Sequence, residues 1–267
     1  MAYFYRMKMM SGGDFAGITA YPVHQPKSNG GRLRRRSRCN STKEAQAWGN
    51  KRRAEDYFFY LIHNNYGLED QRLDLDITWP NMPKSVEEFK RIMRNFVQRL
   101  RRLYRRWGLE LRLVWIPEIT LEGRYHVHAF INGGVPIMLI QKCWRIGRAN
   151  SSPFQYDREG LRGYIHYVFK KPLVAKHWCA TKNLKKPQER CSDYILQRKI
   201  VEAVRRGDYT TLERALPGWE VVNHREEFEE PTLVNWDVIT SDVIDNEVDG
   251  QPYIYIKLCR RDAALSF

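Results

Sequence analysis

The sequence predicts an α+β fold: an antiparallel β-sheet of about five strands flanked by helices, with a small C-terminal extension. Short runs such as "RLDLDITW" (72–79) alternate apolar and polar residues, as half-buried strands do. Longer runs between them have the apolar spacing of helices. The strands expected at 110–119 and 124–132 are separated by Thr-Leu-Glu-Gly, a link short enough for an antiparallel hairpin.

Residues 1–40 are expected to form an irregular, flexible basic arm, followed by the main domain at 41–190. The arm contains five arginines between positions 32 and 38; a solvated arm and a phosphate-binding arm both fit them, and the DNA-binding candidates among them are Arg34, Arg35, Arg36 and Arg38. The main domain opens with a helix over 41–67, because Ser41 and Glu44 form a capping box.

The segment 85–107 has the clearest helical pattern in the chain. Ser85 and Glu88 form a second capping box, and Gly108 is a suitable stop. One face is an apolar stripe, and the other carries seven arginines between positions 91 and 106. A solvated face is the ordinary interpretation of such charges; the residues proposed to hold DNA are Arg101, Arg102 and Arg105.

The second half continues the α+β pattern. A short helix is expected near 137–146, a strand near 152–156, a helix over 159–172 ended by Pro172, and a last strand over 176–183. Residues 191–267 are expected to be an accessory extension, made of a helix over 192–208, an acidic stretch, and a strand over 251–259.

The charge distribution predicts a polyanionic partner. The formal net charge is +14, but the stretch 220–250 alone carries −9, which leaves +23 on all other residues. Nucleic acid is the partner that such a charge favours, and a basic protein with no special partner is the alternative. The five cysteines form no CxxC pair, and no run is apolar enough for a signal peptide or a membrane span, so the cytoplasm is expected.

The motif "EITLEGRYHVHAFING" (118–133) offers a candidate metal site. Side chains alternate along a strand, so His126 and His128 lie on one face, and the hairpin brings Glu118 beside them. Two imidazoles and a carboxylate, with open positions, suit a divalent cation. Two structural histidines and a Glu118 that lies in solvent or pairs with an arginine are the alternative.

The helix expected over 159–172 offers a candidate nucleophile. Tyr164 and Tyr167 share a face, with Lys170 one turn beyond Tyr167 and Lys171 beside it. A tyrosine can attack a phosphodiester, although its ordinary pKa near 10 requires help from a cation. Tyrosines at the edge of the core are the alternative.

The order of these pieces resembles the HUH endonuclease superfamily, and more closely the rolling-circle replication initiators (Rep proteins) of bacterial phages and plasmids. The motifs that carry the resemblance are "LDLDITW" followed by a basic helix, "GRYHVHAFI", "YVFKKP" and "CATKNLKKP", within residues 40–190. It implies that Glu118, His126 and His128 bind Mg²⁺ or Mn²⁺, that Tyr167 is the nucleophile and that Lys170 assists it. Some relatives use two tyrosines four residues apart; the spacing here is three, so Tyr164 is a secondary candidate.

The resemblance therefore implies a metal-dependent nickase and strand transferase that acts on single-stranded or hairpin origin DNA in a bacterial host cell. These residues contain no GxxxxGK[ST] loop, so a host helicase is expected as a partner together with a polymerase. A mobilisation relaxase or a single-strand transposase would share the chemistry. A non-enzymatic nucleic-acid-binding protein is the alternative of another class.

Overall fold

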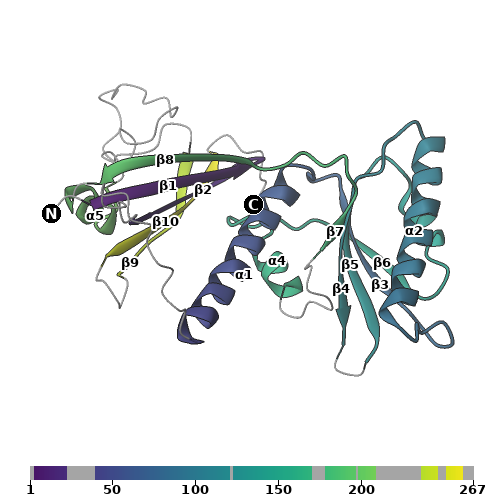
Figure 1. The fold of residues 1–267 in the computed structure, drawn as a ribbon. Coiled ribbons are helices and arrows are strands. Elements are labelled where there is room, and N and C mark those ends of the chain that lie inside the picture. Colours follow the sequence, from purple (N-terminus) through teal and green to yellow (C-terminus); the bar gives the residue numbers. More distant parts are fainter. Residues whose placement is uncertain are drawn as a thin grey trace, which may run out of the picture. The chain divides into compact units, whose positions relative to one another are not determined.

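The computed structural model describes residues 3–22, 40–120, 123–169, 178–196, 198–208, 236–245 and 251–260. These residues form an α+β fold with two five-stranded antiparallel sheets and five helices, which confirms the predicted class (Figure 1). The chain divides into two compact units: residues 1–53 with 187–267, and residues 54–186.

The first unit contains a sheet of strand order β8-β1-β2-β10-β9 and the helix α5. The bounds are β1 Tyr3–Gly12, β2 Phe15–Pro22, β8 Gln188–Leu196, α5 Arg198–Arg205, β9 Trp236–Asp245 and β10 Pro252–Arg260. One face packs Met7, Ile18 and Ile256 against Val201 and Val204 of α5. The N-terminal and C-terminal strands therefore share one apolar core.

This unit corrects two sequence predictions. Residues 3–22 are not an irregular arm, because β1 and β2 form a hairpin with Gly13 at its turn, where φ is +57°. Residues 192–196 are not helical, because β8 continues through them in pairing with β1, and the helix begins only at Arg198. The strand predicted at 251–259 is confirmed as β10. The remainder of the predicted arm lies outside the described residues.

The second unit contains the sheet β6-β3-β5-β4-β7. The bounds of its elements are β3 Gln71–Asp76, α2 Val86–Arg106, β4 Leu113–Ile119, β5 Tyr125–Ile131, α3 Ile137–Lys142, β6 Ala149–Pro153, α4 Arg162–Val168 and β7 Cys179–Ala180. The helix α1, Asn40–His63, is continuous across the boundary between the units at residue 53. The predicted five-stranded sheet, the 118–133 hairpin and each predicted helix of this unit are present, although α3 and α4 are shorter than expected.

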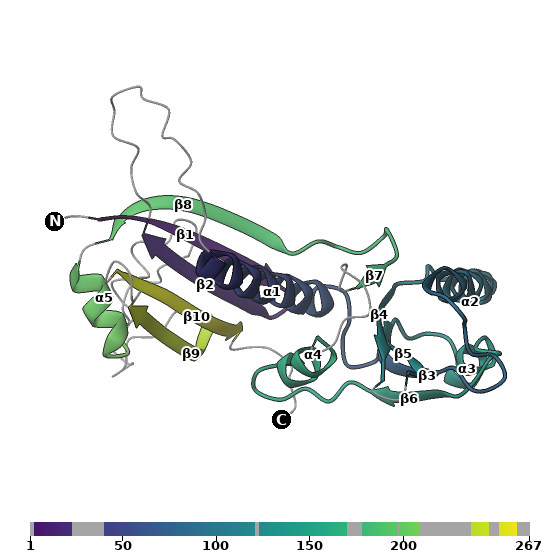
Figure 2. The same cartoon turned by 60° about the horizontal axis from the view of Figure 1, so that its bottom comes forward.

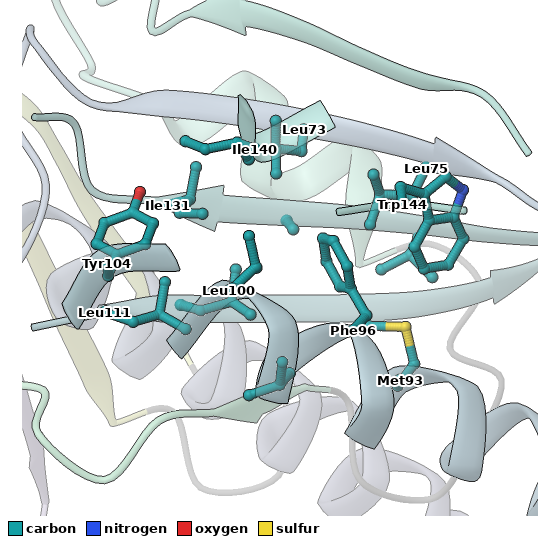
Figure 3. Packing of buried hydrophobic residues seen from close by; sticks show 14 of the residues in the cluster. Leu73, Leu75, Met93, Phe96, Leu100, Tyr104, Leu111, Ile131, Ile140 and Trp144 are labelled. Carbon is teal, nitrogen blue, oxygen red and sulfur yellow. The ribbon is translucent and has the colours of Figure 1, made fainter. Parts of the chain in front are cut away.

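Helices α2 and α3 cover one face of this second sheet, as Figure 2 shows. The apolar stripe of α2 contributes Met93, Phe96 and Leu100, which pack against Leu73 and Leu75 of β3 (Figure 3). Ser85 caps the helix by accepting a hydrogen bond from the backbone N–H of Glu88 at 3.1 Å, as its capping box predicts. Gly108 ends it with φ +69°, in the left-handed region that favours glycine.

The opposite face of the sheet packs against α4 and the second half of α1. Phe58 of α1 contacts Phe130 of β5 and Phe169 at the end of α4, with ring centroids 5.6 and 5.0 Å apart. Polar contacts add to this packing: Arg162 pairs with Asp56 at 3.0 Å. The two faces of the sheet therefore have different roles, since one is closed by the apolar core and the other holds the polar groups described below.

His63, the last residue of α1, connects the two helices from within the protein. Its Nδ1 lies 2.8 Å from the carbonyl oxygen of Phe59, and its Nε2 accepts the backbone N–H of Leu161, the N-cap of α4, at 3.2 Å. Only a neutral imidazole makes both bonds, donating at Nδ1 and accepting at Nε2. Burial lowers the pKa of His63 to about 3.

This buried histidine predicts acid destabilisation. An unfolded chain binds a proton at His63 near pH 6.5, whereas the folded chain does so only near pH 3, so the contribution of His63 to stability is complete above pH 6.5 and is lost as the pH falls towards 3. We expect urea unfolding of the wild type to lose up to about 1.4 kcal/mol per pH unit relative to His63→Gln in this window. His166→Gln, at an exposed position, is the control. Parallel pH profiles for the wild type and His63→Gln would contradict this.

Candidate metal centre and tyrosine helix

Three adjacent strands place polar side chains on the face of the second sheet that is turned away from α2. In the register of the sheet, Asp74 lies opposite His128, Asp76 lies opposite His126, and Glu118 lies opposite His126 from the other side. The intervening residues Leu75 and Val127 are buried in the core beneath α2. Alternation along the strands thus separates the ligand-type residues from the apolar ones, as the His-x-His pattern predicts.

Each histidine is held by a carboxylate of β3. The Nδ1 of His126 lies 2.6 Å from Oδ1 of Asp76, and the Nδ1 of His128 lies 2.7 Å from Oδ1 of Asp74. Because an ionised carboxylate only accepts hydrogen bonds, both rings donate at Nδ1 and keep the Nε2 lone pair for another partner. Such carboxylate–histidine pairs orient metal-binding imidazoles in proteins.

The Nε2 side of the rings faces further acidic oxygens. Glu118 Oε2 lies 3.3 Å from Nε2 of His128, and Asp74 Oδ1 lies 3.8 Å from Nε2 of His126. Asp74, His126 and His128 each offer a ligand atom within 4.8 Å of the others, so the three could hold one ion. Two nitrogen ligands and one carboxylate oxygen suit Mn²⁺ well, and carboxylates suit Mg²⁺. Whether Glu118 is also a ligand, as the sequence predicts, stays a prediction.

Charge coupling shapes the pKa values at this site. Burial raises the pKa of Asp74, but hydrogen bonds and attraction from His126 and His128 together outweigh burial and leave it well below its ordinary value. The hydrogen bond with Asp74 raises the pKa of His126, burial opposes this, and Asp76 adds to the increase. Asp74 therefore stays ionised at neutral pH and places negative charge where a cation would bind.

Both candidate tyrosines of α4 lie beside His128, in different environments. Tyr167 is 57% exposed, and its ring centroid is 5.8 Å from that of His128. Tyr164 is half-buried, and its hydroxyl lies 3.5 Å from Nδ1 of His128. Burial, and then Asp74, raise the pKa of Tyr164 well above its ordinary value, although Arg72, 5.0 Å from the ring centroid, opposes this. Tyr167 is thus the tyrosine that a large substrate can reach.

Two ionic contacts and one hydrogen bond fix α4 in this position. Arg162 pairs with Asp56, His166 lies 2.9 Å from Glu55, and the Leu161 N–H bonds to His63. All three partners lie in the second half of α1. The orientation of the tyrosines thus depends on α1 as well as on the sheet.

The predicted DNA-binding arginines of α2 lie on the other side of the sheet. Arg101, Arg102 and Arg105 are exposed, and Arg101 and Arg105 line a groove of about 340 Å³ together with Leu109–Leu111 and Thr181–Asn183. Because α2 covers the face opposite His126 and His128, these arginines are not brought to the metal centre. The other predicted basic residues, together with the predicted catalytic Lys170, lie outside the described residues: Arg34, Arg35, Arg36, Arg38 and Lys171.

Sequence reasoning missed Asp74 and Asp76. The alternation in "LDLDITW" placed both aspartates on one strand face, opposite the buried leucines, and that was the available signal. What identifies them as site residues is the pairing of β3 with β5, which joins residues about fifty positions apart.

Comparison with known proteins agrees with the sequence resemblance. Residues 77–176 match the family model of the replication-associated protein known as ORF2 or gene II protein. The matched segment contains the β4–β5 hairpin and α4, and so includes both histidines, Glu118 and both tyrosines. No curated protein matches the chain significantly. Residues 77–176 therefore have the sequence of a replication-associated Rep protein, as the sequence predicted.

Proposed function

We propose that this chain is a metal-dependent nickase and strand transferase that initiates rolling-circle replication on single-stranded or hairpin origin DNA. The observation that carries the proposal is the exposed Tyr167 beside the cluster of Asp74, His126 and His128. The match of residues 77–176 to a replication-associated family supports the same reaction class.

Three residues, Asp74, His126 and His128, would hold the divalent ion, with Glu118 next to them. Mg²⁺ or Mn²⁺, when bound, supplies positive charge that polarises the scissile phosphate. Asp76 keeps the imidazole of His126 oriented through its Nδ1–H. The sheet therefore holds both rings with their Nε2 atoms available.

The hydroxyl oxygen of Tyr167 then attacks the scissile phosphorus. A bond forms between this oxygen and phosphorus, and the bond from phosphorus to the 3′ oxygen breaks, so that the strand carries a free 3′-OH and the enzyme a 5′-phosphotyrosine. The tyrosine proton leaves to solvent, and the departing oxygen takes one up. Because the energy of the phosphodiester is kept, attack by a later 3′-OH rejoins strands without ATP.

Tyr164 fits a supporting role better than that of a second nucleophile. Its hydroxyl is half-buried against His128, and its raised pKa disfavours the tyrosinate that attack requires. Lys170 is proposed to position the phosphate next to Tyr167. The freed 3′-OH would prime a host polymerase, and a host helicase would unwind the duplex.

An adduct assay tests the proposal. Single-stranded oligonucleotides that tile the DNA around the coding gene, labelled at the 3′ end, are incubated with the protein and Mn²⁺ and then separated in SDS. We expect a covalent adduct that is absent with EDTA, absent in Tyr167→Phe and retained in Tyr164→Phe. An adduct that survives in Tyr167→Phe but disappears in Tyr164→Phe would assign the nucleophile to Tyr164. If no oligonucleotide gives an adduct, the chain binds nucleic acid without cleaving it.

A further inference from the structure

Trp79 is unusually exposed and held by an ordered turn. Its side chain is 85% exposed, and it follows β3 by three residues. Three hydrogen bonds fix the turn: the N–H of Asn81 donates to the carbonyl of Thr78 at 2.9 Å, the N–H of Thr78 donates to the carbonyl of Ile146 at 3.1 Å, and the side-chain amide of Asn81 donates to the same Ile146 oxygen at 3.4 Å. An indole in water on a fixed backbone loses little conformational freedom when a partner covers it.

Arg148 lies at the same end of the sheet, next to the metal centre. The backbone N–H of Asp76 donates to the carbonyl of Arg148 at 2.9 Å, one position beyond the paired residues Leu75 and Ala149. Ala149 packs towards the core beneath α2, so alternation places Arg148 on the face that carries Asp76 and His126. Arg148 is exposed, as is Arg145 nearby.

We infer that Trp79 and Arg148 form a contact surface for single-stranded DNA, in which the indole stacks on a base and the guanidinium binds a backbone phosphate. Aromatic faces combined with basic side chains are how proteins bind single strands without reading sequence. Three extended residues span at most about 11 Å, so Trp79 lies within one to two nucleotides of the metal-centre carboxylate Asp76. The surface would hold the strand beside the scissile phosphate, and in this it rests on the proposed function.

The α2 arginines, by contrast, are separated from the metal centre by the sheet. A strand bound at the metal centre meets Arg148 without passing an edge of the sheet, whereas it must pass an edge to reach Arg101 or Arg105. Arg148 and Trp79 are thus the basic and aromatic groups that the strand order itself places beside Asp76.

Equilibrium binding in EDTA tests this surface without requiring catalysis. The probe is a fluorescein-labelled oligothymidylate of about 20 nucleotides, long enough to cover a single-strand site, followed by fluorescence anisotropy. We expect Trp79→Ala to weaken binding about tenfold, and Trp79→Phe to restore most of it, since a phenyl ring still stacks. Trp107→Ala is the matched control, because Trp107 is 49% exposed at the end of α2, on the other side of the sheet, and should leave the affinity unchanged.

The charge is tested by salt dependence. Arg148→Ala should reduce the slope of log affinity against log salt by about 0.7, the value for one phosphate contact on a single strand. Arg91→Ala, in which an exposed arginine of α2 paired with Glu88 is removed, should leave the slope unchanged. Urea midpoints equal to that of the wild type establish that Trp79→Ala and Arg148→Ala are folded.

The outcomes separate this inference from the proposed function. Wild-type affinity and slope in Trp79→Ala and Arg148→Ala, alongside normal adduct formation, would overturn the contact surface and leave the nickase proposal standing. Weakened binding in both variants, with no adduct from the wild type on any tiled oligonucleotide, would support the surface and overturn the nickase proposal.

Discussion

His126→Ala is expected to abolish the Mn²⁺-dependent adduct and most of the affinity for Mn²⁺. The substitution removes one of the two imidazoles of the cluster, whose Nε2 is the nitrogen left free by the bond to Asp76. Loss of an orienting carboxylate costs about 10- to 100-fold in metal affinity, and loss of a ligand should cost more. Isothermal titration with Mn²⁺ measures this directly. Asp76→Ala, which removes only the orienting partner, should fall between His126→Ala and the wild type.

The control for this experiment is His166→Ala. His166 lies on α4 and pairs with Glu55, so the variant loses an imidazole without touching the cluster. Its Mn²⁺ affinity should match that of the wild type. If His126→Ala and His166→Ala bound Mn²⁺ equally, the cluster would not be the metal site.

Gly147→Ala is expected to cause a large loss of stability. A Cβ at this position would overlap the carbonyl oxygen of Asp76 and lie 3.0 Å from the nitrogen of Thr78, so it meets backbone atoms at the end of the strand on which the site is built. Relief requires the chain around Asp76 to move. We expect unfolding in urea to require about 3 kcal/mol less free energy, at the upper end for overpacking, together with weaker Mn²⁺ binding.

Gly163→Ala is the matched control for this substitution. Gly163 lies in α4, and a Cβ there meets no atom within 4 Å. Alanine in place of a helical glycine should raise stability by roughly 0.5–1 kcal/mol. Wild-type stability in Gly147→Ala would show that the 146–148 backbone is not in contact with β3 as the structure has it.

The sequence was most informative where structure is determined locally. The spacing of apolar residues along α2, its cap at Ser85 and the hairpin that brings Glu118 beside His126 all depend on residues near one another in the chain, and each is confirmed. The α+β class follows from the same local periodicities.

Pairings between distant segments could not be predicted in this way. The strand pattern of β1 is present, since Tyr5 and Met7 alternate with Arg6 and Lys8, but its partner β8 begins only at Gln188. Without a known partner, an alternating segment near one end of a basic chain is easily interpreted as an irregular arm. Asp74 and Asp76 were missed for the same reason, because their proximity to the histidines exists only through the β3–β5 ladder.

The alternation of ligands and core residues on β3, β4 and β5 has a consequence for folding. A slip of one residue in the pairing of β5 would turn both histidines into the apolar core and bring Val127 to the polar face. An ion that requires Asp74, His126 and His128 together can bind only the correct register, and at about a hundred times its dissociation constant it would favour that register by about 2.7 kcal/mol. The cation would then act during folding as a selector of strand alignment, before any DNA is bound.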